Sequence, residues 1–339
     1  MMAPRKPRIA LYYKFPPRGA PPPMPPIPAF IPLFRNPHAQ TILGHYWKRP
    51  SGESLCPTVQ RLFRTEPEVQ VFVESQRPVA PERGAIVMVH GLEGSSQAVY
   101  MRSLAAAALA AGFAAHRFNL RTCGGSEHHC QTLYHAGLTS DLLSVLRQLC
   151  TEGSPPAILV GFSLGGNVVL KLAGELAEAA PPLVRAVCAV STPLDLAACA
   201  RRMAQPSNRI YESRFVSRMK ARLEATGRYR RQDLQGLRSV MEIDDRITAP
   251  SFGFGNADNY YRTQSSRLFL HNVRVPTLLI QAKDDPMVPF EAFQAREVRE
   301  NDRIRLVAPD HGGHLGFLAR RGPRFWVDAV IMAWIAGLG

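Results

Sequence analysis

A glycine-rich segment at residues 161–166 carries the strongest chemical signal in the sequence. It reads GFSLGG and matches the pattern G-x-S-x-G, in which a serine occupies a sharp turn between a strand and a helix. The apolar run AILV precedes the segment and the helical stretch NVVLKLAGELAE follows it, as the pattern requires. Gly161 and Gly165 lack the β-carbons that would clash in such a turn. We therefore predict that Ser163 is a nucleophile at a helix N-terminus, where the helix dipole favours a developing anion. The alternative is an ordinary glycine-rich turn before a helix.

A pair of aspartates and a pair of histidines each follow an apolar run later in the chain. Asp284 and Asp285 come after TLLIQA, and His311 and His314 come after IRLVA. A serine nucleophile needs a base that takes its proton and an acid that orients the base, here in the chain order Ser, Asp, His. His314 is the predicted base because the two glycines before it permit a tight loop. Asp285 is the predicted acid because Pro286 fixes the direction of the residue before it. We expect Asp284 to accept loop N–H groups and His311 to be a loop residue.

An oxyanion hole for this chemistry needs two converging backbone N–H groups. One is expected from Leu164, the residue after the nucleophile. The segment HGLEGSS at residues 90–96 follows the apolar run AIVMV, and its His-Gly pair lets the backbone turn back toward the site. We predict that Leu92 supplies the second N–H, with a simple capped loop as the alternative.

The segment CGGSEHHC at residues 123–130 offers ligand types for zinc, but its spacing matches no common zinc site. We interpret it as a loop beside the site, and we expect no metal and no cofactor. The six cysteines form no compact framework and are expected to be free thiols in a reducing compartment.

The elements that must position these residues alternate between short apolar runs and helical stretches. Buried parallel strands are predicted at 85–90, 113–120, 157–162, 184–190, 277–280 and 304–307. Helices are predicted at 97–111, 136–150, 165–178 and 323–336. This alternation predicts an α/β fold with a doubly wound, mostly parallel sheet. Between about residues 194 and 272 the alternation lapses into an Arg-rich helical insertion, which we interpret as a lid over the carboxyl edge of the sheet.

The first 60 residues are predicted to form a proline-rich arm, and residues 61–339 the main domain. Ten prolines lie between residues 16 and 37, a density that excludes a regular helix or a central strand there. Apolar residues between the prolines indicate that the arm packs on the domain; a flexible tail is the alternative.

The net charge of +14, from 41 basic and 27 acidic residues, suits nucleic acid, anionic lipid or acidic substrates equally. Residues 201–238 carry much of it, and they indicate either a solvated helical face or a surface that contacts an anionic membrane. No nucleic-acid recognition motif is present, so no nucleic acid is expected as a partner. No apolar run of 18 residues and no signal peptide are evident, and we expect a cytoplasmic protein.

The sequence resembles the YheT-like family of α/β-hydrolases, relatives of the mammalian abhydrolase esterases and phospholipases. The resemblance covers nearly the whole chain and rests on several motifs: FRNPHAQTIL at 34–43, HGLEGSSQAVYMR at 90–102, RTCGGS at 121–126, GFSLGGN at 161–167, DDRITAPSFGF at 244–254, DDPMVP at 284–289 and HGGHLGF at 311–317. It implies the α/β-hydrolase fold, a triad of Ser163, Asp285 and His314, and esterase or acylglycerol lipase activity without a cofactor.

The predicted function is the hydrolysis of carboxylic esters through an acyl-enzyme on Ser163. Small-molecule or lipid esters with short- to medium-chain acyl groups are the expected substrates, and monoacylglycerols are among the candidates. A phospholipase or thioesterase with the same triad is the first alternative. A basic, non-catalytic binding protein on the same fold is the second.

Overall fold

A nine-stranded sheet forms the centre of the protein. The computed structural model describes residues 10–11, 26–51 and 56–338, and the sheet order is β1-β9-β8-β7-β6-β4-β5-β3-β2. The strands are β1 Ala10–Leu11, β2 Val59–Glu66, β3 Val69–Gln76, β4 Ala85–Val89, β5 Ala114–Phe118, β6 Ala157–Phe162, β7 Val184–Val190, β8 Thr277–Ile280 and β9 Ile304–Ala308. Strands β4 to β9 run parallel, while β1, β2 and β3 pair antiparallel with their neighbours. All six predicted strands are present, in the predicted mostly parallel sheet.

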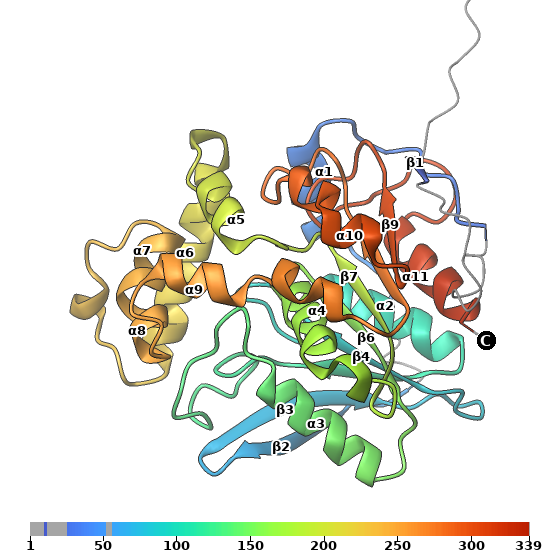
Figure 1. Cartoon of the computed structure of the whole chain (residues 1–339), viewed down its shortest axis with the longest axis horizontal. Helices are drawn as coiled ribbons and strands as arrows, with labels where there is room; N and C mark the ends of the chain where they lie inside the picture. The colour runs from blue at the N-terminus through green and yellow to red at the C-terminus, as the bar shows by residue number, and fades with distance from the viewer. Residues whose placement is uncertain (1–9, 12–25, 52–55, 339) are drawn as a thin grey trace, which may run out of the picture.

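Helices cover both faces of this sheet, which explains why the central strands are apolar along their whole length (Figure 1). On one face α2 Val99–Ala110 packs beside α11 Trp326–Ala336. On the other lie α3 Ser140–Thr151 and α4 Leu164–Leu176, and α10 Arg296–Glu300 packs near β9. The two apolar cores, one on each face, confirm the doubly wound α/β architecture.

The segment between β7 and β8, where the sequence predicts an insertion at about residues 194–272, is helical. It contains α5 Leu196–Met203, α6 Arg209–Ala225, α7 Val240–Ile243, α8 Ala249–Ser251 and α9 Ala257–Gln264, joined by short 3₁₀ and π turns. Helices α6 to α9 form a lobe at the left of Figure 1. This lobe has a small apolar core of its own, which includes Met219, Leu223 and Ile243.

The described part of the N-terminal arm packs on the domain, but it also contains a helix that was not predicted. Helix α1 Pro37–Tyr46 begins where the proline run ends: Pro37 fills the first helical position, and the Asn36 side chain accepts from the Ala39 N–H at 3.0 Å. Earlier in the arm, Phe30 is 4% exposed and lies against the rings of Phe317 and Trp326. The rest of the predicted arm, residues 1–9, 12–25 and 52–55, lies outside the described residues.

Strands β2 and β3 form an antiparallel hairpin at one edge of the sheet, and neither strand was predicted. The first of them begins at Val59, inside the range assigned to the arm. Its outer face is polar and exposed, so it lacks the continuous apolar run on which the other strands were recognised.

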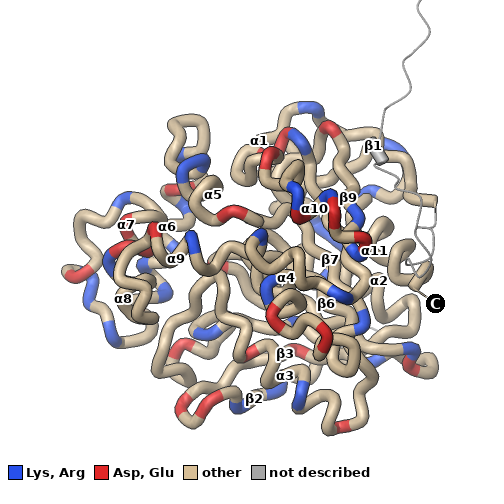
Figure 2. The backbone as a smooth tube through the Cα atoms, in the orientation of Figure 1, with Lys and Arg blue, Asp and Glu red and all other residues tan. Residues whose placement is uncertain are grey.

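Two observations bear on membrane contact. No helix among the described residues combines the length and the apolar character needed to cross a bilayer. The helical insertion carries many of the basic residues, and Figure 2 shows them interspersed with acidic positions.

Candidate active site

The turn between β6 and α4 holds Ser163 in a strained conformation. Its backbone angles are φ 50° and ψ −122°, a region that residues with side chains rarely occupy. A β-carbon at Gly161 would lie 2.3 Å from the Gly165 carbonyl oxygen, and one at Gly165 would lie 2.3 Å from the Val89 carbonyl oxygen. Both positions therefore require glycine, as the sequence pattern predicted. The turn projects the Ser163 hydroxyl above the carboxyl edge of the sheet.

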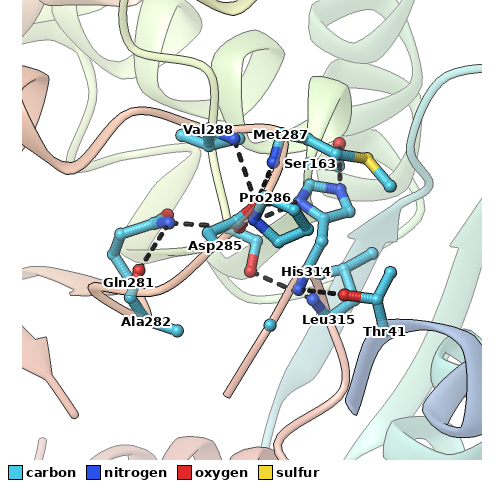
Figure 3. A network of polar contacts seen from close by, with 12 residues as sticks. Thr41, Ser163, Gln281, Ala282, Asp285, Pro286, Met287, Val288, His314 and Leu315 are labelled. Atoms are coloured by element: carbon cyan, nitrogen blue, oxygen red, sulfur yellow. Dashed lines mark hydrogen bonds and ion pairs between the residues drawn. The ribbon is translucent and has the colours of Figure 1, made fainter. Parts of the chain in front are cut away.

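Ser163, His314 and Asp285 form one chain of hydrogen bonds (Figure 3). The Ser163 Oγ lies 3.0 Å from His314 Nε2, and His314 Nδ1 lies 2.9 Å from Asp285 Oδ2. The three residues follow different parallel strands, β6, β8 and β9, whose carboxyl ends meet at one edge of the sheet. The structure therefore brings together the three residues that the sequence singled out. His314 is 8% exposed and Asp285 3%, so the pair is largely shielded from water.

Further hydrogen bonds fix the Asp285 carboxylate. Its Oδ1 accepts from the N–H groups of Met287 at 2.9 Å and Val288 at 3.0 Å, and its Oδ2 accepts from Gln281 Nε2 at 3.1 Å. These donors hold the carboxylate in place and aim it at the His314 ring. Gln281 was not predicted to take part, and no motif in the sequence marked it.

Asp284 points to a different partner. It accepts from the Gly313 N–H at 3.0 Å and lies 3.1 Å from His311 Nδ1, while burial raises its pKa above the usual value. Asp284 thus braces the loop that carries His314, as expected, and His311 is a loop residue that contacts this carboxylate.

Helix α1 of the arm also supports the histidine. The His314 N–H donates to Thr41 Oγ1 at 2.8 Å, and the Thr41 hydroxyl donates to the Pro37 carbonyl at 2.8 Å. A β-carbon at Gly313 would lie 2.4 Å from that same carbonyl, so the loop must have glycine to approach the helix. Residues 34–43 were noted for their resemblance to the family, but this contact was not predicted.

Two backbone N–H groups are available near Ser163. Among the described residues, no acceptor engages the N–H of Leu92 or of Leu164, the first residue of α4. The turn before Leu92 is tightly held: the Gly91 N–H donates to the Tyr100 hydroxyl at 3.1 Å, and His90 Nε2 accepts from the Leu120 N–H at 3.1 Å. Burial lowers the pKa of His90 to about 4, so this ring is neutral and structural.

The residue after Leu92 connects this turn to the helical insertion. Glu93 has a positive φ of 52° and is 5% exposed. Arg222 of α6 donates from Nε to both of its carboxylate oxygens, at 2.8 and 3.1 Å, and the Tyr134 hydroxyl lies 3.0 Å from one of them. Arg222 is therefore a buried ion-pair partner, although the sequence had placed it among the surface cations of the insertion.

An apolar cavity of about 110 Å³ opens on Ser163 beneath the insertion. Most of the residues that line it are apolar or aromatic, with Leu196 and Met203 from α5, Phe215 from α6, and Tyr134 and Val288 from the domain among them. Helices of the insertion thus form one wall of the cavity and separate it from solvent.

The cysteine- and histidine-containing loop packs against the outer hairpin. Cys130 is buried, and its backbone forms an isolated antiparallel β-bridge with Val69 at the start of β3. Cys123 is also buried. All six cysteines are free thiols. In the described ranges no cluster of three or more His, Cys, Asp or Glu is arranged to hold a metal ion.

Comparisons with known proteins point to one family. The model of the alpha/beta hydrolase family matches residues 86–326. The chain is 32% identical over 319 residues to a protein of Escherichia coli (strain K12) named "Putative esterase YheT", covering 90% of this chain and 92% of that protein. It is 28% identical to the monoacylglycerol lipase of Saccharomyces cerevisiae, over 71% of this chain and 56% of that protein. It is 27% identical to the mouse phospholipase ABHD3, over 76% of this chain and 65% of that protein.

A solved structure agrees on the fold. The Pyrococcus furiosus esterase Pf2001 superposes with a TM-score of 0.56 at 17% identity, covering 84% of this chain and 96% of that one. At this identity the likeness concerns the fold alone.

Proposed function

This chain belongs to the alpha/beta hydrolase family, and we propose that it hydrolyses carboxylic esters through an acyl-enzyme on Ser163. The observation that carries the proposal is the continuous chain of hydrogen bonds from Ser163 Oγ through His314 to Asp285. Named relatives of the chain include an esterase, a lipase and a phospholipase, so a hydrolase is the class of enzyme that the comparisons support.

The first half of the reaction forms the acyl-enzyme. His314 Nε2 takes the proton of the Ser163 hydroxyl as its oxygen attacks the ester carbonyl carbon. The carbonyl oxygen becomes an oxyanion, which the N–H groups of Leu92 and Leu164 stabilise. When the tetrahedral intermediate collapses, the bond to the alcohol oxygen breaks and His314 returns the proton to that oxygen.

The second half releases the acid. His314 removes a proton from water, the water oxygen attacks the acyl carbon, and the bond to Ser163 breaks as His314 reprotonates the serine. Asp285 keeps the ring in the tautomer that can accept from Ser163 and stabilises the imidazolium. The sequence of steps is complete without a cofactor or a metal ion.

The apolar cavity supports a short- to medium-chain acyl group. A dry cavity of ~150 Å³ is known to hold a six-carbon ligand such as benzene. By that measure a volume of about 110 Å³ suits a chain of roughly four to five carbons beyond the carbonyl without movement of the insertion. Longer chains require α5 and α6 to shift, which is the role that we propose for the insertion as a lid.

A phospholipase or thioesterase remains the second candidate, because the same triad serves each leaving group. The named mouse relative favours the first of these. The candidates are distinguished by measuring hydrolysis rates of the purified protein on esters, thioesters and phospholipids that share one acyl group. The Ser163→Ala variant serves as the blank. We expect turnover of butyrate and hexanoate esters. No turnover of any of these classes, with the protein folded, would leave a non-catalytic binding protein as the better account.

Contact with an anionic membrane is a further proposal, supported by the exposed basic residues of the insertion. Arg214 and Arg218 on α6 are exposed and remain candidates for this contact, whereas Arg222 is buried against Glu93 and is not. The expected result is co-sedimentation with anionic but not with neutral vesicles at low salt.

A further inference from the structure

A second cavity also borders Ser163 and shares part of its lining, including Leu92 and Phe215, with the apolar cavity. Its volume is about 380 Å³, and its walls come from α1, from α6 and from the loop at residues 91–98. Ser163 and His314 line both this cavity and the apolar one. Ser163 therefore stands where two cavities meet, an arrangement that suits the cleavage of an ester with two dissimilar halves.

The second cavity is larger than the first and differs from it in charge. Arg214 and Arg218 lie one turn apart on α6 and both line it. Among the described residues that line this cavity the acidic one is Glu93, and it pairs with Arg222. Arg214 and Arg218 are thus left without a carboxylate partner within that lining, and both are exposed.

Uncharged side chains hold Arg214 at the edge of the second cavity. Arg214 donates from Nη1 to the Tyr46 hydroxyl at 2.9 Å, and its Nη2 lies 3.0 Å from His45 Nε2. Burial, followed by the charges of Arg214 and Arg218, lowers the pKa of His45 and so disfavours the charged form of this ring. The contact bridges α6 and α1 without neutralising the guanidinium.

Apolar side chains surround the two cations. Ile42 is 39% exposed, Tyr46 66% and Ile210 75%, and all three line the cavity. An unpaired cationic pair beside exposed apolar surface fits an amphiphile that carries an anion. The planar guanidinium matches the oxygens of a phosphate or a carboxylate in particular.

We propose that the second cavity is the leaving-group subsite, and that Arg214 and Arg218 bind an anionic group on the alcohol portion of the substrate. This inference rests on the proposed ester hydrolysis at Ser163, because it assigns the apolar cavity to the acyl half. The substrate class is then an ester of a short- to medium-chain acid with an alcohol that carries a phosphate or a carboxylate. Such a group can belong to a lipid or to a soluble ester.

The test compares substrates that share one acyl group and differ in the substituent on the third glycerol carbon. The probes are 1-butyrylglycerol, 1-butyrylglycerol 3-phosphate and its phosphocholine analogue, all soluble as monomers. Charge-assisted hydrogen bonds favour the phosphate ester over the neutral ester by about tenfold or more in kcat/KM. Arg218→Gln and Arg214→Gln should each remove most of this preference, measured as the ratio of kcat/KM for the phosphate ester to kcat/KM for the neutral ester, and Arg218→Lys should retain part of it.

Arg209→Gln is the matched control, because Arg209 is an exposed arginine of the same helix that lines neither cavity. This variant should keep the preference for the phosphate ester over the neutral ester. If it loses as much of that preference as Arg218→Gln does, the effect is one of general charge and the subsite assignment is wrong. Equal kcat/KM for the neutral and phosphate esters in the unmodified protein would overturn it as well. A preference seen only when the ester is presented in anionic vesicles would assign the arginines to a lipid surface instead. Failure to hydrolyse any of the three esters, by contrast, contradicts the proposed function itself.

Discussion

Replacing Asp285 with asparagine tests the orientation of the base, and Asp284→Asn is the matched control one residue away. In the 285 variant the amide oxygen can keep the bonds from the Met287 and Val288 N–H groups, which leaves the amide nitrogen facing His314 Nδ1. That nitrogen donates, so the imidazole proton moves to Nε2. The ring then cannot accept from Ser163 Oγ, 3.0 Å away.

The same geometry sets the size of the effect. Loss of the correct tautomer costs roughly 10⁴-fold in kcat in serine hydrolases, about 5.5 kcal/mol in the barrier. The fold should survive, because Gln281 Oε1 has no hydrogen-bond partner in the described structure and can rotate to accept from the new amide, at the cost of the bond from Gln281 Nε2 to the Ala282 carbonyl. Asp284→Asn keeps an acceptor for the Gly313 N–H and should cost about tenfold or less, roughly 1.4 kcal/mol.

The assay is kcat on a butyrate ester together with the melting temperature of each variant. A severe loss at Asp284 with a mild one at Asp285 reverses the assignment of the acid. Mild losses at both positions remove the aspartate from the mechanism.

Three further predictions concern the walls of the site and the stability of the fold. Arg222→Met leaves the Glu93 carboxylate buried and unpaired, so we expect a loss of about 3–5 kcal/mol in unfolding free energy and a lower kcat; an unchanged melting temperature would contradict the role of this ion pair. Ala200→Phe fills the apolar cavity and should abolish turnover of hexanoate esters but not acetate esters, whereas Ala204→Phe, at an exposed position on the same segment, should change neither; equal chain-length profiles count against the acyl assignment. Burial lowers the pKa of His90 and His116 to about 4 and of His135 to about 3, so the unfolded chain binds protons below pH 6.5 that the folded chain does not. Unfolding free energy should therefore fall by up to about 1.4 kcal/mol per pH unit for each histidine as the pH drops from 6.5 toward 4, and His116→Gln should reduce the slope measured by thermal unfolding.

The parts of the fold that could be predicted are those in which burial leaves a recognisable pattern of apolar residues in the sequence. The central strands are buried on both faces and therefore read as apolar runs, and each is followed by a helix. Strand β2 escaped prediction because it is at the sheet edge with one face exposed. Helix α1 escaped because its first residue, Pro37, is also the last of the proline run, and the proline was taken to exclude a helix rather than to begin one.

The candidate site divides in the same way. Ser163, Asp285 and His314 could be predicted because each follows a recognisable strand, and parallel strands bring their carboxyl ends to one edge. Thr41 and Arg222 could not, because their contacts join segments far apart in the chain: Thr41 meets a residue 273 positions away, and Arg222 one 129 positions away. A single sequence carries no periodic or spacing signal for such pairs. The basic run 201–238 likewise indicates a surface feature, although one of its arginines, Arg222, is an interior ion-pair partner.

The central claim is that Ser163 is the nucleophile, and covalent labelling tests it most directly. The purified protein is treated with a fluorophosphonate probe, alongside Ser163→Ala and the control Ser213→Ala, which removes an exposed hydroxyl of α6 outside both cavities. We predict stoichiometric labelling and ester hydrolysis in the unmodified protein and in Ser213→Ala. Both should be lost in Ser163→Ala at an unchanged melting temperature. Labelling or hydrolysis that persists in Ser163→Ala would contradict the account, since the reaction would then proceed from another residue.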